Sequence, residues 1–72
     1  MRLVEITRGG EDSVTDQLAE MRQWLRREGI EPLQLEPVAV LRARVHFRAG
    51  FALVEHAERF RRQFDEARAE LA

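Results

Sequence analysis

The chain has 72 residues, no cysteine and a formal net charge of −1 at neutral pH. A chain of this length forms one domain, residues 1–72, with a thin core that oligomerisation commonly reinforces. The absence of cysteine excludes disulfides and thiolate metal sites, and the small net charge provides no basic field to attract nucleic acid or membrane. No apolar run approaches the roughly 20 residues that span a bilayer, and no signal peptide is expected. The expected location is the cytoplasm.

The basic residues are unusual because, apart from two histidines, all of them are arginine. Lysine, asparagine and tyrosine are absent, and isoleucine occurs only as Ile6 and Ile30. The missing residues have AT-rich codons, whereas most arginine codons are GC-rich. A GC-rich bacterial genome therefore explains the arginine content, and arginine alone is weak evidence for a binding site.

The first half of the chain predicts a strand followed by a helix. Residues 3–7 are expected to form a short strand with Val4 and Ile6 on one face and the other three residues on the opposite face. The glycine pair after Arg8 marks a turn. Asp12 or Ser13 is expected to cap a helix that ends at Gly29. Apolar residues at helical spacing form its buried side, with tryptophan at the margin: Val14, Leu18, Met21, Leu25 and Trp24.

The segment after this helix is ambiguous. Residues 33–36 alternate, and Pro32 and Pro37 on either side favour an edge strand because proline cannot donate to a ladder. The alternation then changes phase between Pro37 and Val40, which indicates a turn or a bulge. We favour a tight hairpin there, with the next strand beginning near Val40. The alternative is one long, bent strand.

Residues 41–48 alternate strictly, which is the pattern of a strand with one buried face. The side chains expected to face the core are Leu41, Ala43, Val45 and Phe47. Those expected on the opposite face are Arg42, Arg44, His46 and Arg48. Together the latter would form a cationic row on the sheet.

A second, longer helix is expected from just after Gly50 to about Ala69. Its apolar positions alternate spacings of three and four: Leu53, Ala57, Phe60, Phe64, Ala67 and Leu71. This pattern also fits a coiled-coil seam, but phenylalanines suit packing against a sheet better than knobs-into-holes pairing. We therefore expect this side of the helix to contribute to the core.

The element order is strand, helix, strand, strand, helix. It predicts a two-layer α+β sandwich in which two helices cover one face of a three-stranded mixed sheet. The order resembles a ferredoxin-like fold that lacks its last strand. This resemblance covers the whole chain but rests on element order alone, so it implies no residue roles. Without the last strand, the edge formed by residues 3–7 is expected to be open.

No catalytic, cofactor or metal site is predicted. The chain has no phosphate-binding glycine loop or nucleophile elbow, and Ser13, its only serine, has a capping role available. His46 and His56 are the only histidines and lack the close spacing of metal ligands. We therefore do not expect an enzyme.

The sequence favours a protein-interaction module that forms a homodimer, or binds another protein, through the open edge or the sheet face. Residues expected on this interaction surface are Leu3, Glu5, Thr7, Trp24, Arg42, Arg44, His46 and Arg48. RNA or anion binding through the arginine face is the alternative, although RRM-type sheets stack bases on aromatic residues that this face lacks. Cross-strand Glu–Arg pairs would instead leave it a solvated surface. A small-ligand sensor subunit is a third hypothesis, and Trp24 more commonly covers a core than anchors a partner.

Overall fold

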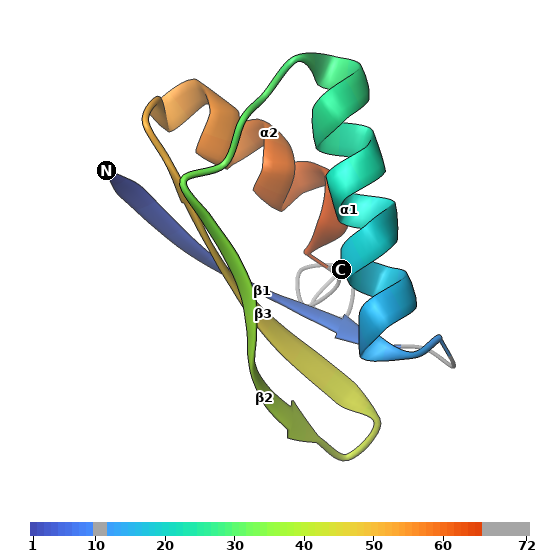
Figure 1. Ribbon diagram of the computed structural model, residues 1–72. Coiled ribbons are helices and arrows are strands. Elements are labelled where there is room, and N and C mark those ends of the chain that lie inside the picture. Colours follow the sequence, from blue (N-terminus) through green and yellow to red (C-terminus); the bar gives the residue numbers. More distant parts are fainter. Residues whose placement is uncertain (10–11, 66–72) are drawn as a thin grey trace.

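The computed structural model describes residues 1–9 and 12–65. In chain order the elements are β1 (Arg2–Gly9), α1 (Val14–Glu28), β2 (Gln34–Leu41), β3 (Arg44–Phe51) and α2 (Val54–Phe64). Both helices lie on the same face of the sheet, and the β2–β3 hairpin extends beyond them (Figure 1). The predicted two-layer α+β architecture and its element order are therefore confirmed.

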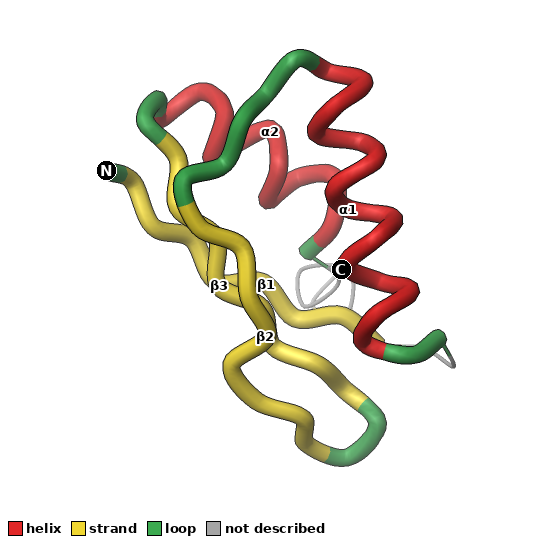
Figure 2. The backbone as a smooth tube through the Cα atoms, in the orientation of Figure 1, coloured by secondary structure: helices red, strands yellow, loops and turns green. Residues whose placement is uncertain are grey.

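The sheet has the strand order β1-β3-β2, so β3 is central and both β1 and β2 are edge strands (Figure 2). Both pairs of neighbours are antiparallel, and the expectation of a mixed sheet was wrong in this respect. The reason is that α1 carries the chain back, so β1 and β2 run in the same direction, and the hairpin then reverses β3 relative to both of its neighbours. β1 is thus an edge strand, as expected for the first strand of the chain.

Local sequence signals define both ends of α1. The Ser13 hydroxyl accepts a hydrogen bond from the Asp16 backbone N–H at 3.1 Å, so Ser13 is the N-cap. Gly29 adopts the left-handed conformation with φ 72° and donates to the Arg26 carbonyl, which satisfies one of the last carbonyls of the helix. Both caps agree with the prediction.

The hairpin turn lies later than predicted. β2 continues through Leu41, the turn is formed by Arg42 and Ala43, and β3 begins at Arg44. The phase change between Pro37 and Ala39 is a β-bulge within β2 rather than the turn. Residues 41–48 therefore do not form one strand. Leu41 and Ala43 are exposed instead of buried, and Arg42 lies in the turn instead of on the sheet face with the other predicted cations.

The turn residues are strained. Arg42 and Ala43 have positive φ angles of 49° and 64°, the left-handed conformation that two-residue hairpins require and that Asn-Gly adopts most easily. Each such residue costs about 1–2 kcal/mol relative to the right-handed region. We expect the double substitution Arg42→Asn, Ala43→Gly to raise the free energy of unfolding by about 1 kcal/mol or more. Urea denaturation measures this change. Arg42→Ala removes the charge but keeps the strain, and an equal gain in that control would contradict the explanation.

The core lies between β3 and the two helices. Its fully buried large side chains are Phe47, Phe51, Phe60, Ile6, Met21 and Leu25. The rings of Phe51 and Phe60 are 5.3 Å apart, so the end of β3 and the middle of α2 meet in one aromatic contact. Alternate β3 residues point into this core, as expected for Val45 and Phe47.

The second helix begins later than predicted because β3 extends to Phe51. Pairing of Arg2 with Phe51 and of Leu3 with Gly50 continues the ladder over the full length of β1. Leu53 is consequently the exposed residue before α2, not part of its buried side. Ala57, Phe60 and Phe64 are buried as expected. The helix also ends earlier than the predicted Ala69, because Asp65 after Phe64 is already extended. Residues 66–72, which include the predicted Ala67 and Leu71, lie outside the described residues.

Candidate functional site

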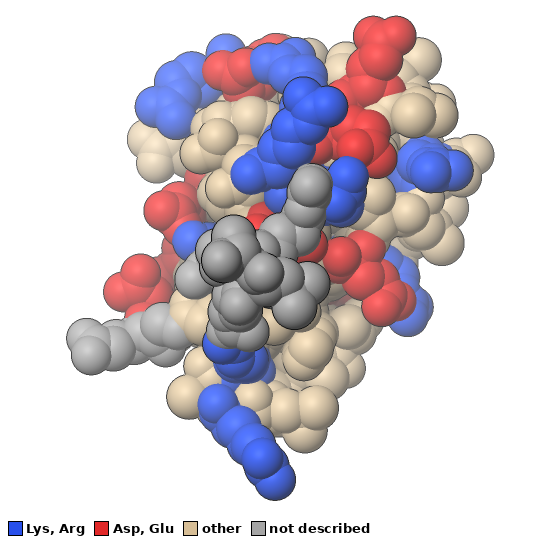
Figure 3. Space-filling model, turned by 180° about the vertical axis from the view of Figure 1, so that it is seen from behind, with Lys and Arg blue, Asp and Glu red and all other residues tan. Residues whose placement is uncertain are grey.

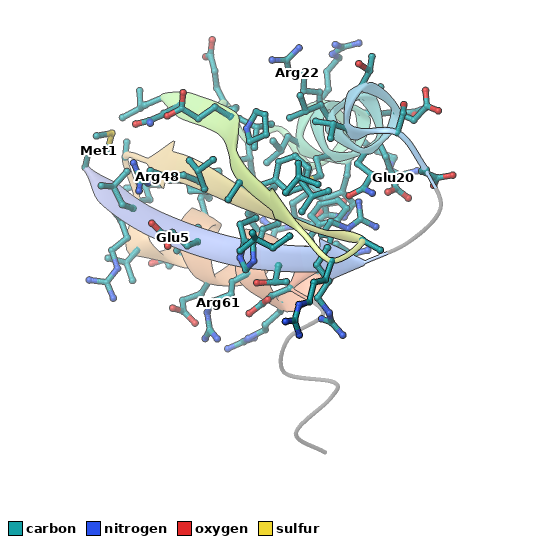
Figure 4. All side chains as sticks on the ribbon, turned by 90° about the horizontal axis from the view of Figure 1, so that it is seen from below. Met1, Glu5, Glu20, Arg22, Arg48 and Arg61 are labelled. Carbon is teal, nitrogen blue, oxygen red and sulfur yellow. The ribbon has the colours of Figure 1, made fainter. Side chains whose placement is uncertain are left out.

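The face of the sheet opposite the helices carries the polar residues predicted for it on β1 and β3. Glu5 pairs with Arg48 and Thr7 with His46 across the two strands. Arg48 donates a hydrogen bond from Nη2 to Glu5 Oε2 at 2.9 Å, and the two side chains lie side by side in Figure 4. Thr7 Oγ1 and His46 Nδ1 are 3.1 Å apart. We name this surface, formed by Leu3, Glu5, Thr7, Arg44, His46 and Arg48, the outer sheet face.

The expected cationic row is not continuous on this face. Arg42 lies in the hairpin turn, and the charge of Arg48 is paired with Glu5. Arginine and acidic side chains are also interspersed on the side of the molecule seen in Figure 3, where β1 and α2 lie. On the outer sheet face, the contact between Glu5 and Arg48 matches the cross-strand Glu–Arg pairing that the sequence suggested. An exposed pair of this kind contributes about 0.2–1 kcal/mol to stability.

One end of the outer sheet face is apolar. A Cβ placed on Gly50 would lie 2.7 Å from Met1 Sδ and 3.3 Å from Leu3 Cδ2, so these two side chains cover the glycine. The Leu3 side chain is nevertheless 50% exposed. An exposed leucine therefore lies directly beside the open edge of β1.

The backbone groups of β1 alternate between β3 and the open edge. The Thr7 N–H points to the edge, because it donates to Asp65 Oδ1 at 3.1 Å instead of to β3. In an antiparallel ladder the N–H and C=O of one residue point to the same side, and alternate residues share that side. The N–H and C=O groups of Leu3 and Glu5 therefore face the open edge, where no residue of 1–9 or 12–65 bonds them.

The other edge of the sheet is protected by its sequence. β2 contains Pro37, which has no N–H to offer, and the bulge between Pro37 and Ala39 interrupts its regular geometry. Proline and bulges are common devices by which edge strands avoid pairing with another chain. Exposed apolar side chains do occur on and before this strand, at Leu33, Val38, Val40 and Leu41. Of the two edges, β1 is the one suited to accept a strand.

Charged side chains line the helix side of the β1 edge. α2 packs against β1. On this helix, Arg61 donates a hydrogen bond to Glu58 at 2.7 Å. Asp65, four residues after Arg61, accepts the hydrogen bond of the Thr7 N–H. This hydrogen bond lowers the pKa of the Glu58 carboxyl, and the charge of Arg2 contributes a smaller effect in the same direction. Figure 4 shows Arg61 projecting on the side of the molecule where β1 lies. The edge is thus flanked by charges of both signs.

Trp24 lies between the two helices, away from the β1 edge. Its ring makes an edge-on contact with Phe64, with the ring centroids 5.4 Å apart, and a tilted one with Phe60 at 6.4 Å. The residue is half-buried and packs against the core cluster. This position fits the core-covering role more directly than the partner anchor.

The rest of the described surface has few features that could bind a ligand. A shallow hollow of about 480 Å³ lies at the end of α1, where Arg22, Arg26 and Glu31 surround the apolar residues Leu25, Ile30 and Pro32. In the described part of the chain, no three His, Asp or Glu side chains are grouped as ligands for a metal ion. Nor does any helix of that part have the length and apolar character needed to cross a membrane.

Sequence reasoning found the outer sheet face but missed one of the two residues that limit the sheet edges. Asp65 limits the open edge at Thr7, and Pro37 protects the opposite edge. Pro37 was visible in the sequence as an edge-strand signal, whereas the contact between Thr7 and Asp65 joins positions 58 residues apart. Comparisons with family models, curated proteins and solved structures found no match for this chain.

Proposed function

We propose that this protein is a non-catalytic interaction module that self-associates through the open edge of β1. The observation that carries the proposal is the pair of residues Leu3 and Glu5, whose backbone donors and acceptors face the edge without a partner in the described residues. An added strand satisfies these groups and continues the sheet. The adjoining Leu3 side chain, half exposed beside the edge, would be covered at the same time.

A second copy of the chain is the partner that this edge favours. A two-fold axis lets each copy satisfy the other with the same residues, which is the commonest symmetry of soluble oligomers. The thin core of a domain of this size also benefits from the additional burial. The resulting dimer would be one continuous sheet to which each copy contributes three strands.

The same surface supports an alternative function less strongly. RNA or another anion would bind Arg44, His46 and Arg48 on the outer sheet face. Arg48 is, however, already bonded to Glu5, and His46 lies within hydrogen-bond distance of Thr7. Each contact would have to be given up or shared before these side chains engaged a phosphate.

The substitution Leu3→Pro tests the proposed self-association. It removes an N–H that points to the open edge, so the ladder between β1 and β3 loses no bond, and the extended backbone of β1 tolerates proline. Each copy of the dimer loses the hydrogen bond that its residue 3 donates, and the proline ring lies against the edge of the partner strand. We expect the dissociation constant of the dimer to rise on the order of 100-fold.

Sedimentation equilibrium measures the mass, which should approach twice the 8.4 kDa of one chain for the original protein. Leu3→Thr is the matched control, because it changes the same side chain but keeps the N–H, and it should remain a dimer. Circular dichroism establishes that both variants are folded. A monomeric original protein at high concentration, or a Leu3→Pro variant that dimerises as well as Leu3→Thr, would refute the proposal.

A further inference from the structure

The open edge of β1 is short, and this restricts how two copies can pair. Asp65 already accepts the hydrogen bond of the Thr7 N–H, which closes the edge at that end. On the N-terminal side of Thr7, Leu3 and Glu5 are the residues of β1 whose N–H and C=O groups both face outward and lack partners among the described residues. A second strand gains most when it bonds to both of them.

Three antiparallel two-fold arrangements bring this part of β1 against itself, with the axis at Leu3, Val4 or Glu5. An axis at Glu5 sets two Glu5 carboxylates directly opposite one another, which is destabilising. It also pairs Leu3 with the partner's Thr7, whose N–H is already bonded. An axis at Leu3 pairs Glu5 with the partner's Met1, which precedes the strand.

An axis at Val4 avoids both problems. Leu3 of each copy then pairs with the partner's Glu5, and in an antiparallel hydrogen-bonded pair the two residues exchange both of their N–H to O=C bonds. Every unpartnered group of Leu3 and Glu5 is satisfied. We infer that the protein forms a homodimer in which the two β1 strands pair antiparallel with Val4 on the two-fold axis. This inference rests on the proposed self-association and specifies its geometry.

The helix side of the edge fits the same arrangement. Asp65, which directly follows α2, lies beside Thr7, and Glu58 lies near enough to Arg2 for the charge of Arg2 to lower the pKa of the Glu58 carboxyl. The helix therefore runs alongside β1 in the same direction. A two-fold axis through the middle of β1 brings the Glu58 and Arg61 side chains of both copies together, one acid and one base from each. Glu58 and Arg61 are hydrogen-bonded to each other within each copy, so neither of them brings an unpaired charge to the approach of the two helices.

The side chains on the axis suit close contact. Val4 faces the helices and is only 9% exposed, so a second Val4 beside it extends the apolar core across the interface. Glu5 points to the outer sheet face, where Arg48 keeps its charge paired. Neither copy has to bury an unpaired charge to form the ladder.

Single cysteines test this register, because the chain has no cysteine of its own. In the inferred dimer the two Val4 residues form a non-hydrogen-bonded pair with Cα atoms about 4.5 Å apart, within the range of about 4.4–6.8 Å that a disulfide spans. Leu3→Cys and Glu5→Cys report the two other registers in the same way. Each variant is oxidised mildly as the full chain and analysed by non-reducing electrophoresis, with circular dichroism to establish the fold.

We expect Val4→Cys to be trapped as a covalent dimer at least tenfold faster than either control. Faster trapping of Leu3→Cys or Glu5→Cys would overturn the inferred register while leaving self-association intact. A dimeric mass without trapping at any of the three positions would overturn strand pairing through β1 altogether. A monomeric mass for the original chain would instead refute the proposed function. Val4 is buried, so replacing it with cysteine could itself weaken the dimer. Sedimentation of the Val4→Ala variant measures this effect, because alanine also shortens the side chain but forms no disulfide.

Discussion

Phe60→Ala is expected to remove most of the free energy of unfolding of the protein. The Phe60 side chain is fully buried, and its ring contacts those of Phe51, Phe64 and Trp24 at centroid distances of 5.3, 5.1 and 6.4 Å. Truncating a buried phenylalanine to alanine costs about 3–5 kcal/mol. Small domains have total stabilities near the lower end of about 5–15 kcal/mol, so this loss removes most of the margin.

Urea denaturation followed by fluorescence measures the effect, since Trp24 is the only tryptophan and contacts the substituted ring. Phe60→Leu is the matched control, because it retains most of the apolar volume and should cost less than half as much. A Phe60→Ala variant that unfolds cooperatively within about 1 kcal/mol of the original protein would show that α2 is not anchored through this side chain.

Trp24→Ala is expected to lower the free energy of unfolding by about 2–3 kcal/mol, less than a fully buried aromatic residue because Trp24 is half-buried. The loss arises from the contacts with Phe60 and Phe64, which join α1 to α2. If the chain dimerises through β1 as proposed, the mass of the molecules that remain folded should equal that of the original protein, since Trp24 lies between the helices and away from the β1 edge. Trp24→Phe preserves an aromatic contact and should cost less.

Two measurements on each variant separate the two roles of Trp24. Urea denaturation by circular dichroism reports stability, and sedimentation at low urea reports mass. A folded but monomeric Trp24→Ala variant would place the interface at the helix pair and contradict strand pairing through β1. A destabilised variant that still dimerises agrees with the packing in the structure.

The parts of the fold that were predicted correctly are those specified by local chemistry. Ser13 and Gly29 mark the ends of α1 because a side-chain acceptor and a left-handed residue satisfy backbone groups within a few positions. The burial of Val45 and Phe47 followed from strand alternation alone. Such signals require no knowledge of the rest of the molecule.

The hairpin was misplaced because its turn carries no turn signal. Arg42 and Ala43 are not residues that favour positive φ, yet both adopt it. The phase change at Pro37 is explained equally well by a turn or by a bulge. In the structure it is a bulge, because β2 pairs with β3 on both sides of it. The energy that holds the turn in place comes from the ladder on either side of it, which a sequence pattern does not display.

The candidate site was predictable only in part for a related reason. Alternation along two strands placed Glu5, Thr7, His46 and Arg48 on one face, and the structure adds the register that pairs them. The limit of the β1 edge depends instead on Asp65, which reaches Thr7 only after α2 has packed against the sheet. Long-range contacts of this kind depend on the assembled layers and have no local signature.

The difference between the two sheet edges has a consequence for how far assembly can proceed. An edge strand that pairs with an unlike edge of the next molecule adds copies without end and produces a fibre. Here Pro37 and its bulge make β2 a poor acceptor, so a free β1 meets a suitable surface chiefly in another β1. Once two such edges have joined, neither remains available. If β1 pairs as proposed, Pro37 and its bulge would therefore direct assembly towards a closed pair of chains and away from aggregation.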